Sequence, residues 1–580
     1  MKMVLCKLKA DTVISTQRDR NCQNKRFQKV CFRKLEQTFF PSENEGEQIL
    51  CSPEGSHFPA ENKEDYMLQI KNLSIIHKKD LRVILNDFSC VLNDGDKAVI
   101  IGEEGNGKST LLKWIYDEKL VDDYCETEGE LVKTKERIAY LPQELPKEKR
   151  TLSVYEFFME EESFLEQTPK TLGQMAAKFH VPADFFYREQ PMETLSGGEK
   201  VKAQMMKLLL TEPTVLLLDE PSNDIDVETL EWLEQFIQNW KHIALFISHD
   251  ETLIENTANM IIHIEQIRRK TVSRYTIAKM SYEQYRKERL RNFENQERQA
   301  ESERREKKIR EEKLKRIYQS VDYAQETISR QDPAGGRLLK KKMHAVKSME
   351  QRFEKENENM TEMPEQEGAI FFKLGNKEAA IPAGKTVIEY ELPELWTPDG
   401  ERILAENIFL RIRGSEKICI TGKNGVGKTT LLHKIAEELL NRNDIHAEYM
   451  PQNYEELLQL HVTPVEYLDQ TGKKEERTKI RTFLGALKYT ADEMNHPIAE
   501  LSGGQKAKIF LLKMSMSGAN VLILDEPTRN FSPLSGPVIR KMLKEFPGAV
   551  ISISHDRKYI DEVCDKVYCL TETGLQLQEK

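Results

Sequence analysis

An internal repeat constrains this chain more than any other feature. The glycine-rich segment at 102–110, Gly-Glu-Glu-Gly-Asn-Gly-Lys-Ser-Thr, returns at 422–430 as Gly-Lys-Asn-Gly-Val-Gly-Lys-Thr-Thr. Four short segments follow each copy in the same order: a glutamine after Tyr-Leu-Pro or Tyr-Met-Pro, then Leu-Ser-Gly-Gly, Leu-Asp-Glu-Pro and Ser-His-Asp. One ordered motif set used twice in 580 residues predicts two domains of the same fold.

Each glycine-rich segment has the strand, loop and helix context of a phosphate-binding loop. In the first copy the apolar run 98–101 precedes it and a helical pattern follows from Leu111. Glycines let backbone N–H groups wrap phosphates at a helix N-terminus, the lysine adds positive charge, and the next hydroxyl can ligate magnesium. The predicted binding residues are Gly102, Gly105, Gly107, Lys108, Ser109 and Thr110, and in the second copy Gly422, Gly425, Gly427, Lys428, Thr429 and Thr430.

Two pairs of apolar runs indicate buried parallel strands. Runs 215–218 and 521–524 end in Asp-Glu, and runs 243–247 and 551–554 lead to a histidine. Parallel strands place such residues together at the carboxyl edge of a sheet, where the aspartate can hold magnesium and the glutamate can polarise water. The predicted catalytic residues are Glu220, Glu526, His249, His555, Gln143 and Gln452, and the predicted metal ligands are Ser109, Thr429, Asp219, Asp525, Gln143 and Gln452.

The Leu-Ser-Gly-Gly segments complete the pattern. Their serines can cap helices and present N–H groups to a phosphate. With the other motifs they make residues 67 to about 575 resemble the ATP-binding-cassette (ABC) ATPase superfamily. The resemblance implies an α/β fold, two P-loop cassettes at 67–280 and 367–580, and hydrolysis of ATP with Mg²⁺. It also implies two composite sites, in which Ser502, Gly503 and Gly504 face the first P-loop and Ser196, Gly197 and Gly198 face the second.

The two copies differ after the catalytic glutamates. Glu220 is followed by Pro-Ser-Asn-Asp-Ile-Asp226, the usual D-loop with its terminal aspartate, whereas Ser532 takes that position in the second copy. We therefore expect the two sites to turn over unequally. Candidates for the aromatic that stacks on adenine are His77 and Trp396, for each of which a purely structural role is the alternative.

Residues 281–366 between the cassettes predict a helical hairpin. They are charge-dense, and glycine and proline concentrate at 332–336, which indicates a long helix, a turn and a second helix beginning near Arg337. A basic stem suits structured RNA, whose phosphates dominate affinity, and a solvated spacer is the alternative. The stem residues are Arg286, Lys287, Arg289, Arg291, Arg304, Arg305, Lys307, Lys308, Arg310, Lys313, Lys315 and Arg316.

Two cassettes and a hairpin, with no apolar stretch of the roughly 18 residues that a membrane span needs, resemble the ABC-F family. That resemblance implies a cytoplasmic monomer whose partner is the 70S ribosome. The protein enters the tRNA exit site, and its hairpin reaches the P-site tRNA and the peptidyl-transferase region of 23S rRNA; neither DNA nor a membrane is a partner. The alternatives are a membrane exporter's ATPase subunit, which leaves the hairpin unexplained, and a DNA-repair or chromosome-type ATPase, which normally has a longer coiled coil or zinc modules.

Within ABC-F, the run 529–533 and the longer tip at 318–336 resemble the antibiotic-resistance branch. This branch displaces lincosamides, streptogramin A and pleuromutilins, and a housekeeping translation factor is the alternative.

The net charge of -10 argues against general polyanion binding, and nine cysteines without a CxxC pair indicate reduced thiols. Residues 1–66 match neither copy, so we expect a disordered extension or an over-long start.

Overall fold

The computed structural model describes residues 66–133, 135–267, 271–327, 333–358, 360, 361, 363, 374 and 379–578. The predicted N-terminal extension, apart from Tyr66, lies outside the described residues. The described chain forms two compact units, residues 144–213 and residues 66–143 together with 214–580. The domain boundaries expected from the sequence follow the repeat instead of this division, and they remain a prediction.

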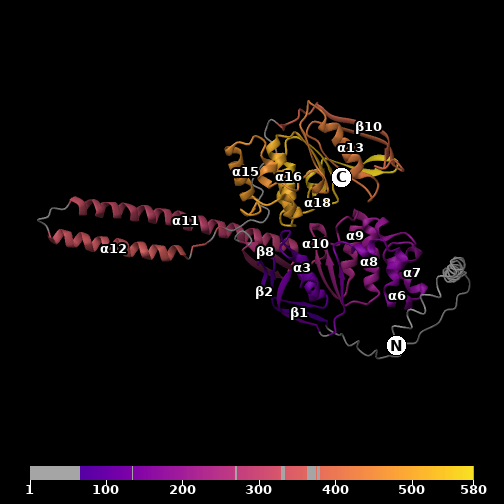
Figure 1. The fold of residues 1–580 in the computed structure, drawn as a ribbon, viewed down its shortest axis with the longest axis horizontal. Coiled ribbons are helices and arrows are strands. Elements are labelled where there is room, and N and C mark those ends of the chain that lie inside the picture. Colours follow the sequence, from indigo (N-terminus) through magenta and orange to yellow (C-terminus); the bar gives the residue numbers. More distant parts are fainter. Residues whose placement is uncertain are drawn as a thin grey trace, which may run out of the picture. The chain divides into compact units, whose positions relative to one another are not determined.

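The first copy of the repeat forms a six-stranded sheet in the order β5-β6-β7-β3-β8-β9 (Figure 1). Its strands are parallel except for the β8–β9 pair. The three central strands are buried along their whole length, which explains their continuous apolar sequences. The strands are β3 (Lys97–Ile101), β5 (Ile138–Leu141), β6 (Val215–Asp219), β7 (Ile243–Ile247), β8 (Met260–Ile267) and β9 (Val272–Ala278), and the helices that follow β3, β6 and β7 are α3 (Lys108–Tyr116), α9 (Val227–Asn239) and α10 (Glu251–Thr257).

The second copy repeats this topology in the order β13-β14-β15-β12-β16-β17. Its last strand pair is again antiparallel. The predicted α/β class with two P-loop cassettes is therefore confirmed. The strands are β12 (Lys417–Thr421), β13 (Ala447–Met450), β14 (Val521–Asp525), β15 (Ala549–Ile553), β16 (Lys566–Thr571) and β17 (Gly574–Gln578), and the helices are α13 (Lys428–Leu440), α14 (Pro464–Leu468), α15 (Lys474–Ala486), α16 (Gly503–Ser517), α17 (Gly536–Lys544) and α18 (Arg557–Val563).

Antiparallel strands precede each P-loop. In the first copy these are β1 and β2, which form a sheet in the order β2-β1-β4 with strand β4 from beyond the P-loop, and in the second copy β10 pairs with β11. Both pairs alternate buried and exposed positions, as expected for sheets with one covered face. Their bounds are β1 (Met67–His77), β2 (Val83–Asn93), β4 (Cys125–Val132), β10 (Thr386–Trp396) and β11 (Ile403–Arg413).

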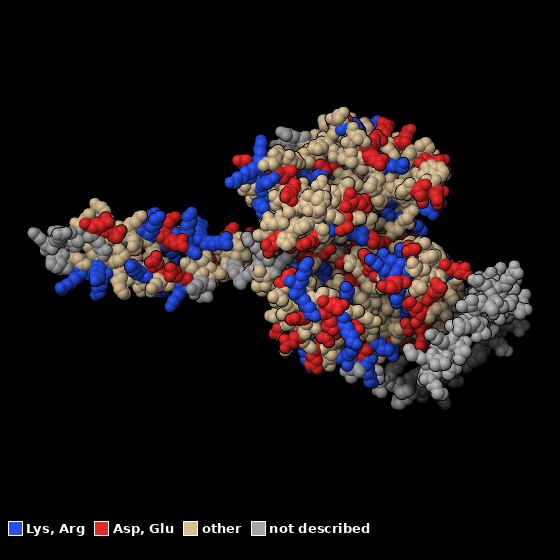
Figure 2. All heavy atoms as spheres, in the orientation of Figure 1, with Lys and Arg blue, Asp and Glu red and all other residues tan. Residues whose placement is uncertain are grey.

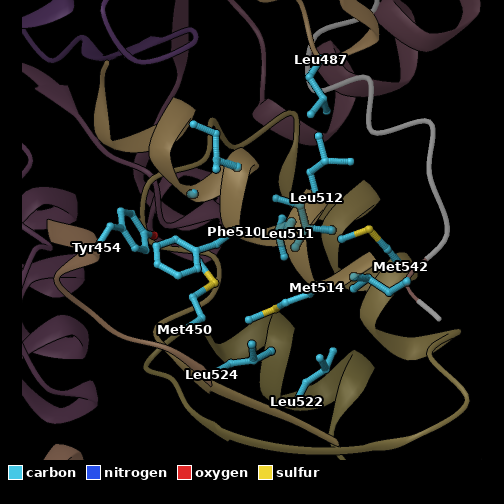
Figure 3. Packing of buried hydrophobic residues seen from close by; sticks show 14 of the residues in the cluster. Met450, Tyr454, Leu487, Phe510, Leu511, Leu512, Met514, Leu522, Leu524 and Met542 are labelled. Carbon is cyan, nitrogen blue, oxygen red and sulfur yellow. The ribbon is translucent and has the colours of Figure 1, made fainter. Parts of the chain in front are cut away.

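An apolar core holds the signature helix α16 against the sheet of the second copy (Figure 3). Phe510 of α16 is 1% exposed, and its ring lies 5.7 Å from that of Tyr454. Met514 and Leu524 join the same cluster from α16 and β14. Burying side chains of this size contributes about 1.5–3 kcal/mol each, so the start of α16 is fixed by the packing of the rest of the helix.

The unit at 144–213 is helical and built around phenylalanines. Phe158 packs edge-on to Phe186 with ring centroids 4.9 Å apart, and Phe164 stacks on Phe158 at 5.5 Å. This core supports the signature helix of the first copy, α8. The helices are α4 (Lys147–Arg150), α5 (Val154–Met159), α6 (Glu162–Glu166), α7 (Pro169–Lys178) and α8 (Gly197–Leu209).

The segment between the cassettes forms the predicted helical hairpin. Helix α11 (Tyr282–Thr327) and helix α12 (Pro333–Glu358) run side by side (Figure 1), and Ala300, Val321 and Val346 are buried. The second helix begins at Pro333, four residues before the expected start near Arg337, because proline is well tolerated at the first position of a helix. Among the described helices, none combines the length and the apolar character that crossing a membrane requires.

Candidate nucleotide-binding sites

The first P-loop has the backbone shape of a phosphate cradle. Gly107 precedes α3 with φ 85°, and Gly102 adopts φ 146° where a Cβ would lie 2.2 Å from the Ile264 carbonyl oxygen. Lys108 Nζ donates hydrogen bonds to the carbonyl oxygens of Gly102 at 3.0 Å and Glu103 at 3.1 Å. The loop therefore curls around its own lysine, with its N–H groups at the helix start.

The second P-loop repeats this shape. Gly427 has φ 97°, and Lys428 Nζ lies 2.8 Å from the Gly422 carbonyl oxygen and 3.0 Å from that of Lys423. In addition, Lys428 donates to Asn424 Oδ1 at 3.3 Å. The predicted residues of both loops thus occupy equivalent positions in the two copies.

The first copy brings two of its three predicted metal ligands, Ser109 and Asp219, together, whereas Gln143 bonds Glu220. Ser109 Oγ donates to Asp219 Oδ1 at 2.9 Å, and the Tyr140 hydroxyl donates to Asp219 Oδ2 at 3.0 Å. Burial raises the pKa of Asp219, and the bond from Ser109 opposes that rise. The sequence analysis missed Tyr140, although a tyrosine precedes the motif glutamine in both copies.

The predicted catalytic residues of the first copy surround one carboxylate. Glu220 accepts a hydrogen bond from Gln143 Nε2 at 2.9 Å, and His249 Nε2 lies 3.2 Å from its other oxygen. Asn223 also donates to this carboxylate. Burial acts to raise the pKa of Glu220, but the charges of His249 and Lys108 and the hydrogen bonds from His249 and Asn223 outweigh it and lower the pKa to about 2.

The second copy is arranged differently. Glu526 accepts weak hydrogen bonds from the His555 backbone N–H at 3.3 Å and Ser554 Oγ at 3.4 Å, while His555 Nε2 lies 3.8 Å away. Gln452 does not bond Glu526, and it donates instead to Asp224 Oδ1 at 3.3 Å. Burial and the charge of the adjacent aspartate raise the pKa of Glu526 to about 8.

The carboxylates at the strand ends suit a magnesium ion shared with a nucleotide. Asp525 Oδ2 is buried without a hydrogen-bond partner, and Thr429 bonds this carboxyl group. Across the part of the chain that the structure describes, no cluster of three or more His, Cys, Asp or Glu residues could hold a metal. A hydroxyl and a carboxylate completed by phosphate oxygens are the usual protein share of a magnesium site.

Both signature serines cap their helices, as predicted. Ser196 Oγ accepts from the Glu199 N–H at 3.3 Å, and Glu199 accepts in return from the Ser196 N–H at 3.1 Å. Ser502 and Gln505 repeat this exchange at 3.4 Å and 3.0 Å. These reciprocal bonds leave the next glycine N–H groups of each helix available to another acceptor.

The first P-loop and the second signature line a common pocket. Its walls include Glu103 and Glu104 from the loop, and Ser502, Gly504 and Lys508 from the signature helix. Across the same contact, His249 Nδ1 lies 2.7 Å from the Phe531 carbonyl oxygen. The signature at 196–198 belongs to the other compact unit, so its pairing with the second P-loop remains a prediction.

The two D-loops differ as their sequences indicate. Asp226 caps α9 by accepting from the Thr229 N–H at 3.0 Å, so that helix begins at Val227. Ser532 is buried and lies 3.1 Å from Ser535 Oγ, and α17 begins only at Gly536. Ser532 bonds Ser535 and does not cap a helix at the position equivalent to Asp226.

The D-loops also hold contacts that the sequence analysis missed. Arg529 pairs with Asp224 at 2.9 Å, and Asn424 Nδ2 donates to the Asp224 carbonyl oxygen at 2.6 Å. Asp224 is one of the few non-glycine residues with positive φ, at 56°. That strain points to a functional contact, but backbone angles are not readable from one sequence.

The adenine-stacking candidates occupy unequal positions. His77 ends β1, and its ring lies 2.7 Å from Asp80 Oδ1. Trp396 ends β10 and is 40% exposed. It pairs with Ile403 of β11, and the corresponding pair in the first copy is Ile76 of β1 with Val83 of β2. Trp396 is therefore one residue out of register with His77, and neither stacking role is tested.

Comparison with known proteins agrees with this geometry. The family model described as ABC transporter matches residues 85–223 and 405–529. The chain is 28% identical over 507 residues to the Ribosome protection protein VmlR of Bacillus subtilis (strain 168), covering 86% of each. It is 25% identical over 538 residues to ABC transporter F family member 5 of Arabidopsis thaliana, covering 83% of this chain and 72% of that protein. The chain contains two ABC cassettes and is similar to ABC transporter F family proteins over more than four fifths of its length.

A solved structure has the same fold as this chain. The archaeal ribosome recycling factor aABCE1, in a crystal structure with the ribosomal stalk protein aP1, superposes with a TM-score of 0.52. It covers 86% of this chain and 87% of that chain at 17% identity. At 17% identity, this likeness shows the fold of the two cassettes alone.

Proposed function

We propose that this protein is an ABC-F ATPase that binds the ribosome, and that its two ATP sites control how long it stays bound. In this proposal the protein enters the tRNA exit site, and its hairpin reaches the P-site tRNA and the peptidyl-transferase region. The observation that carries the proposal is the hairpin itself, a long α11 and an antiparallel α12 inserted between the two cassettes.

The hairpin surface supports an RNA partner. Basic side chains are exposed along α11 and at the start of α12, with acidic residues between them (Figure 2). Two of the expected stem residues face buried carboxylates of the first cassette: Arg286 lies 3.5 Å from Glu251, and Arg289 pairs with Glu265 at 2.5 Å. The exposed stem residues are Lys287, Arg291, Arg304, Arg305, Lys308, Arg310, Lys313, Lys315 and Arg316.

The site residues support hydrolysis that ends the bound state. Lys108 and Lys428 would hold the β- and γ-phosphates, and Mg²⁺ at the paired hydroxyl and carboxylate would neutralise charge on the transferring phosphoryl group. Glu220, positioned by Gln143 and His249, is the group that orients the attacking water in the first site. Glu526 is proposed for the same role in the second.

Protection of the ribosome from antibiotics is the finer proposal. The relative from Bacillus subtilis is named a ribosome protection protein, and the match covers both cassettes and the segment between them. The drugs proposed are lincosamides, streptogramin A and pleuromutilins. A general translation factor is the second candidate, because other relatives at similar identity are named only as ATP-binding proteins.

Sedimentation tests the ribosome proposal. The Glu220→Gln/Glu526→Gln variant keeps its phosphate contacts but loses both water-orienting carboxylates, so with ATP it should accumulate in the 70S fraction. Wild-type protein should remain mostly free under the same conditions. Partition of the variant into membranes, or no ribosome shift, would contradict the proposal. Minimum inhibitory concentrations in a sensitive host then separate drug protection from a general role.

A further inference from the structure

The two P-loops differ in charge at their second and third positions. The first reads Gly102-Glu103-Glu104 and the second Gly422-Lys423-Asn424, although the glycines, the lysine and the following hydroxyl are shared. An acidic pair in a loop that cradles a polyphosphate is unfavourable because like charges repel. Such a pair therefore needs a reason within the structure.

The Glu104 carboxylate lies against the signature of the second cassette. The Gly504 backbone N–H donates a hydrogen bond to Glu104 Oε2. A Cβ at Gly503 would lie 3.2 Å and 3.4 Å from the two Glu104 oxygens, and one at Gly504 would lie 2.9 Å from Oε2. Both oxygens thus face the first residues of α16, a helix of 15 residues whose Ser502 cap leaves these N–H groups open.

Of the two glutamates in this loop, Glu104 makes the contact with the signature glycines. Glu103 points to a different partner, with its carboxylate 3.6 Å from Lys508 Nζ. In the second P-loop, Asn424 occupies the position of Glu104, donates to the Asp224 carbonyl oxygen and accepts from Lys428. Asn424 carries no charge, so it cannot act as an anion at the corresponding place.

A helix N-terminus with free N–H groups is an anion site, and in the composite ATP site that the ABC resemblance implies, that anion would be the γ-phosphate. We propose that Glu104 occupies the γ-phosphate position at the second signature and competes with ATP for it. The inference rests on the proposed assignment of Lys108 and Ser502–Gly504 to one ATP site. ATP must displace the carboxylate before the signature can bind its phosphate, whereas ADP, which lacks that phosphate, need not.

The consequence is a built-in difference between the sites. The site containing Glu104 binds ATP more weakly than its loop geometry alone would allow, and its two halves stay in contact without a nucleotide. A charge-assisted hydrogen bond is worth about 1.5–3 kcal/mol, which corresponds to roughly one to two decades in affinity. The site containing Asn424 has no such competitor.

Nucleotide binding to the full chain tests the proposal. In a Lys428→Ala background, which leaves only the first site, we compare the Kd of a non-hydrolysable ATP analogue and of ADP. Glu104→Asn, which copies the second loop, should lower the Kd of the ATP analogue at least about tenfold and change that of ADP less than about twofold. Glu104→Gln, which keeps the side-chain length, should act in the same direction and guards against a folding defect.

The matched control is Glu103→Gln, which removes the same charge one residue away from the signature contact. Its effect should be smaller and alike for both nucleotides. An unchanged or higher Kd for the ATP analogue in both Glu104 variants would overturn the proposal. An equal fall in the Kd of ADP would also overturn it, as would the same preference for the ATP analogue over ADP in Glu103→Gln. Nucleotide binding that survives in Lys108→Ala/Lys428→Ala would instead overturn the site assignment.

Discussion

The Arg540 guanidinium lies 2.7 Å from the Glu251 carboxylate, with the two side chains 1% and 3% exposed. Glu251 begins α10 directly after the His249 segment of the first cassette, whereas Arg540 lies on α17 of the second. Lys558 of α18 and Arg286 of α11 also approach Glu251, at 3.3 Å and 3.5 Å. One buried carboxylate thus joins the first cassette, the second cassette and the base of the hairpin.

Removing Arg540 should destabilise this junction. Arg540→Met leaves Glu251 buried with only its two more distant partners, and breaking a buried ion pair costs about 3–5 kcal/mol. We expect a loss of about 3 kcal/mol, visible as an earlier first transition in urea unfolding. Lys541→Met is the control, because Lys541 is 76% exposed and its partner Glu545 lies 3.9 Å away. Equal curves for the two variants would show that Glu251 does not depend on Arg540.

The two catalytic glutamates should respond unequally to substitution. Glu220 is held by Gln143 and His249, while Glu526 has two weaker contacts and a D-loop with Ser532 in place of aspartate. Single-turnover rates should therefore fall further in Glu220→Gln than in Glu526→Gln, by about tenfold or more. Identical residual rates would show that the D-loop substitution and the weaker contacts are neutral.

The hairpin tip should carry the effect on the ribosome. Tyr323 near the end of α11 is 70% exposed, and the segment to Gly335 has fewer charges than the stem. Deleting Tyr323 to Gly335 should abolish drug protection while ATPase activity and ribosome binding change little, because phosphate contacts of the stem provide the affinity. Inhibitory concentrations and sedimentation measure the two separately. Full protection by the deletion variant would contradict this division.

The start of α12 should contribute affinity. Lys340, Lys341 and Lys342 are exposed on its first turns. Replacing all three by glutamine removes up to three phosphate contacts, so ribosome binding should weaken and its dependence on salt should become shallower. Binding measured at several salt concentrations gives that slope. A slope unchanged from wild type would exclude these lysines from the RNA contact.

The chain from Met67 onward should be sufficient for ATPase activity. Strand β1 begins at Met67, and its two partner strands, β2 and β4, lie later in the chain. A variant that starts at Met67 should keep the wild-type turnover rate and ribosome binding within about twofold. Loss of ribosome binding alone would assign the preceding residues a direct contact, and loss of both would assign them a role in folding.

The repeat was enough to predict both sheets, and the roles of the site residues remain predictions. The apolar runs before Asp219 and Asp525 form buried parallel strands, because an uninterrupted apolar run is what a strand covered on both faces needs. The serine caps were also predictable, since Ser-x-x-Glu and Ser-x-x-Gln fix a helix start locally.

Contacts that depend on tertiary placement were not predictable. The same motif glutamine bonds Glu220 as Gln143 but bonds Asp224 as Gln452, a difference set by where the D-loop lies. Likewise, Arg286 looks like a phosphate contact in the sequence, but the structure places it beside Glu251. Local pattern cannot tell an exposed arginine from one that finds a buried partner far along the chain.

Because α11 is anchored to the first cassette at its base, a small rotation there becomes a large displacement at the far end of the hairpin. Tyr285 OH lies 2.8 Å from His263 Nδ1 of β8, and Arg289 pairs with Glu265 of the same strand, so the first two turns follow the first cassette rigidly. The whole helix of 46 residues, these first turns included, is about 69 Å long at 1.5 Å per residue. A rotation of only about 5° at the base would sweep the far end through about 6 Å, roughly the pitch of one helical turn.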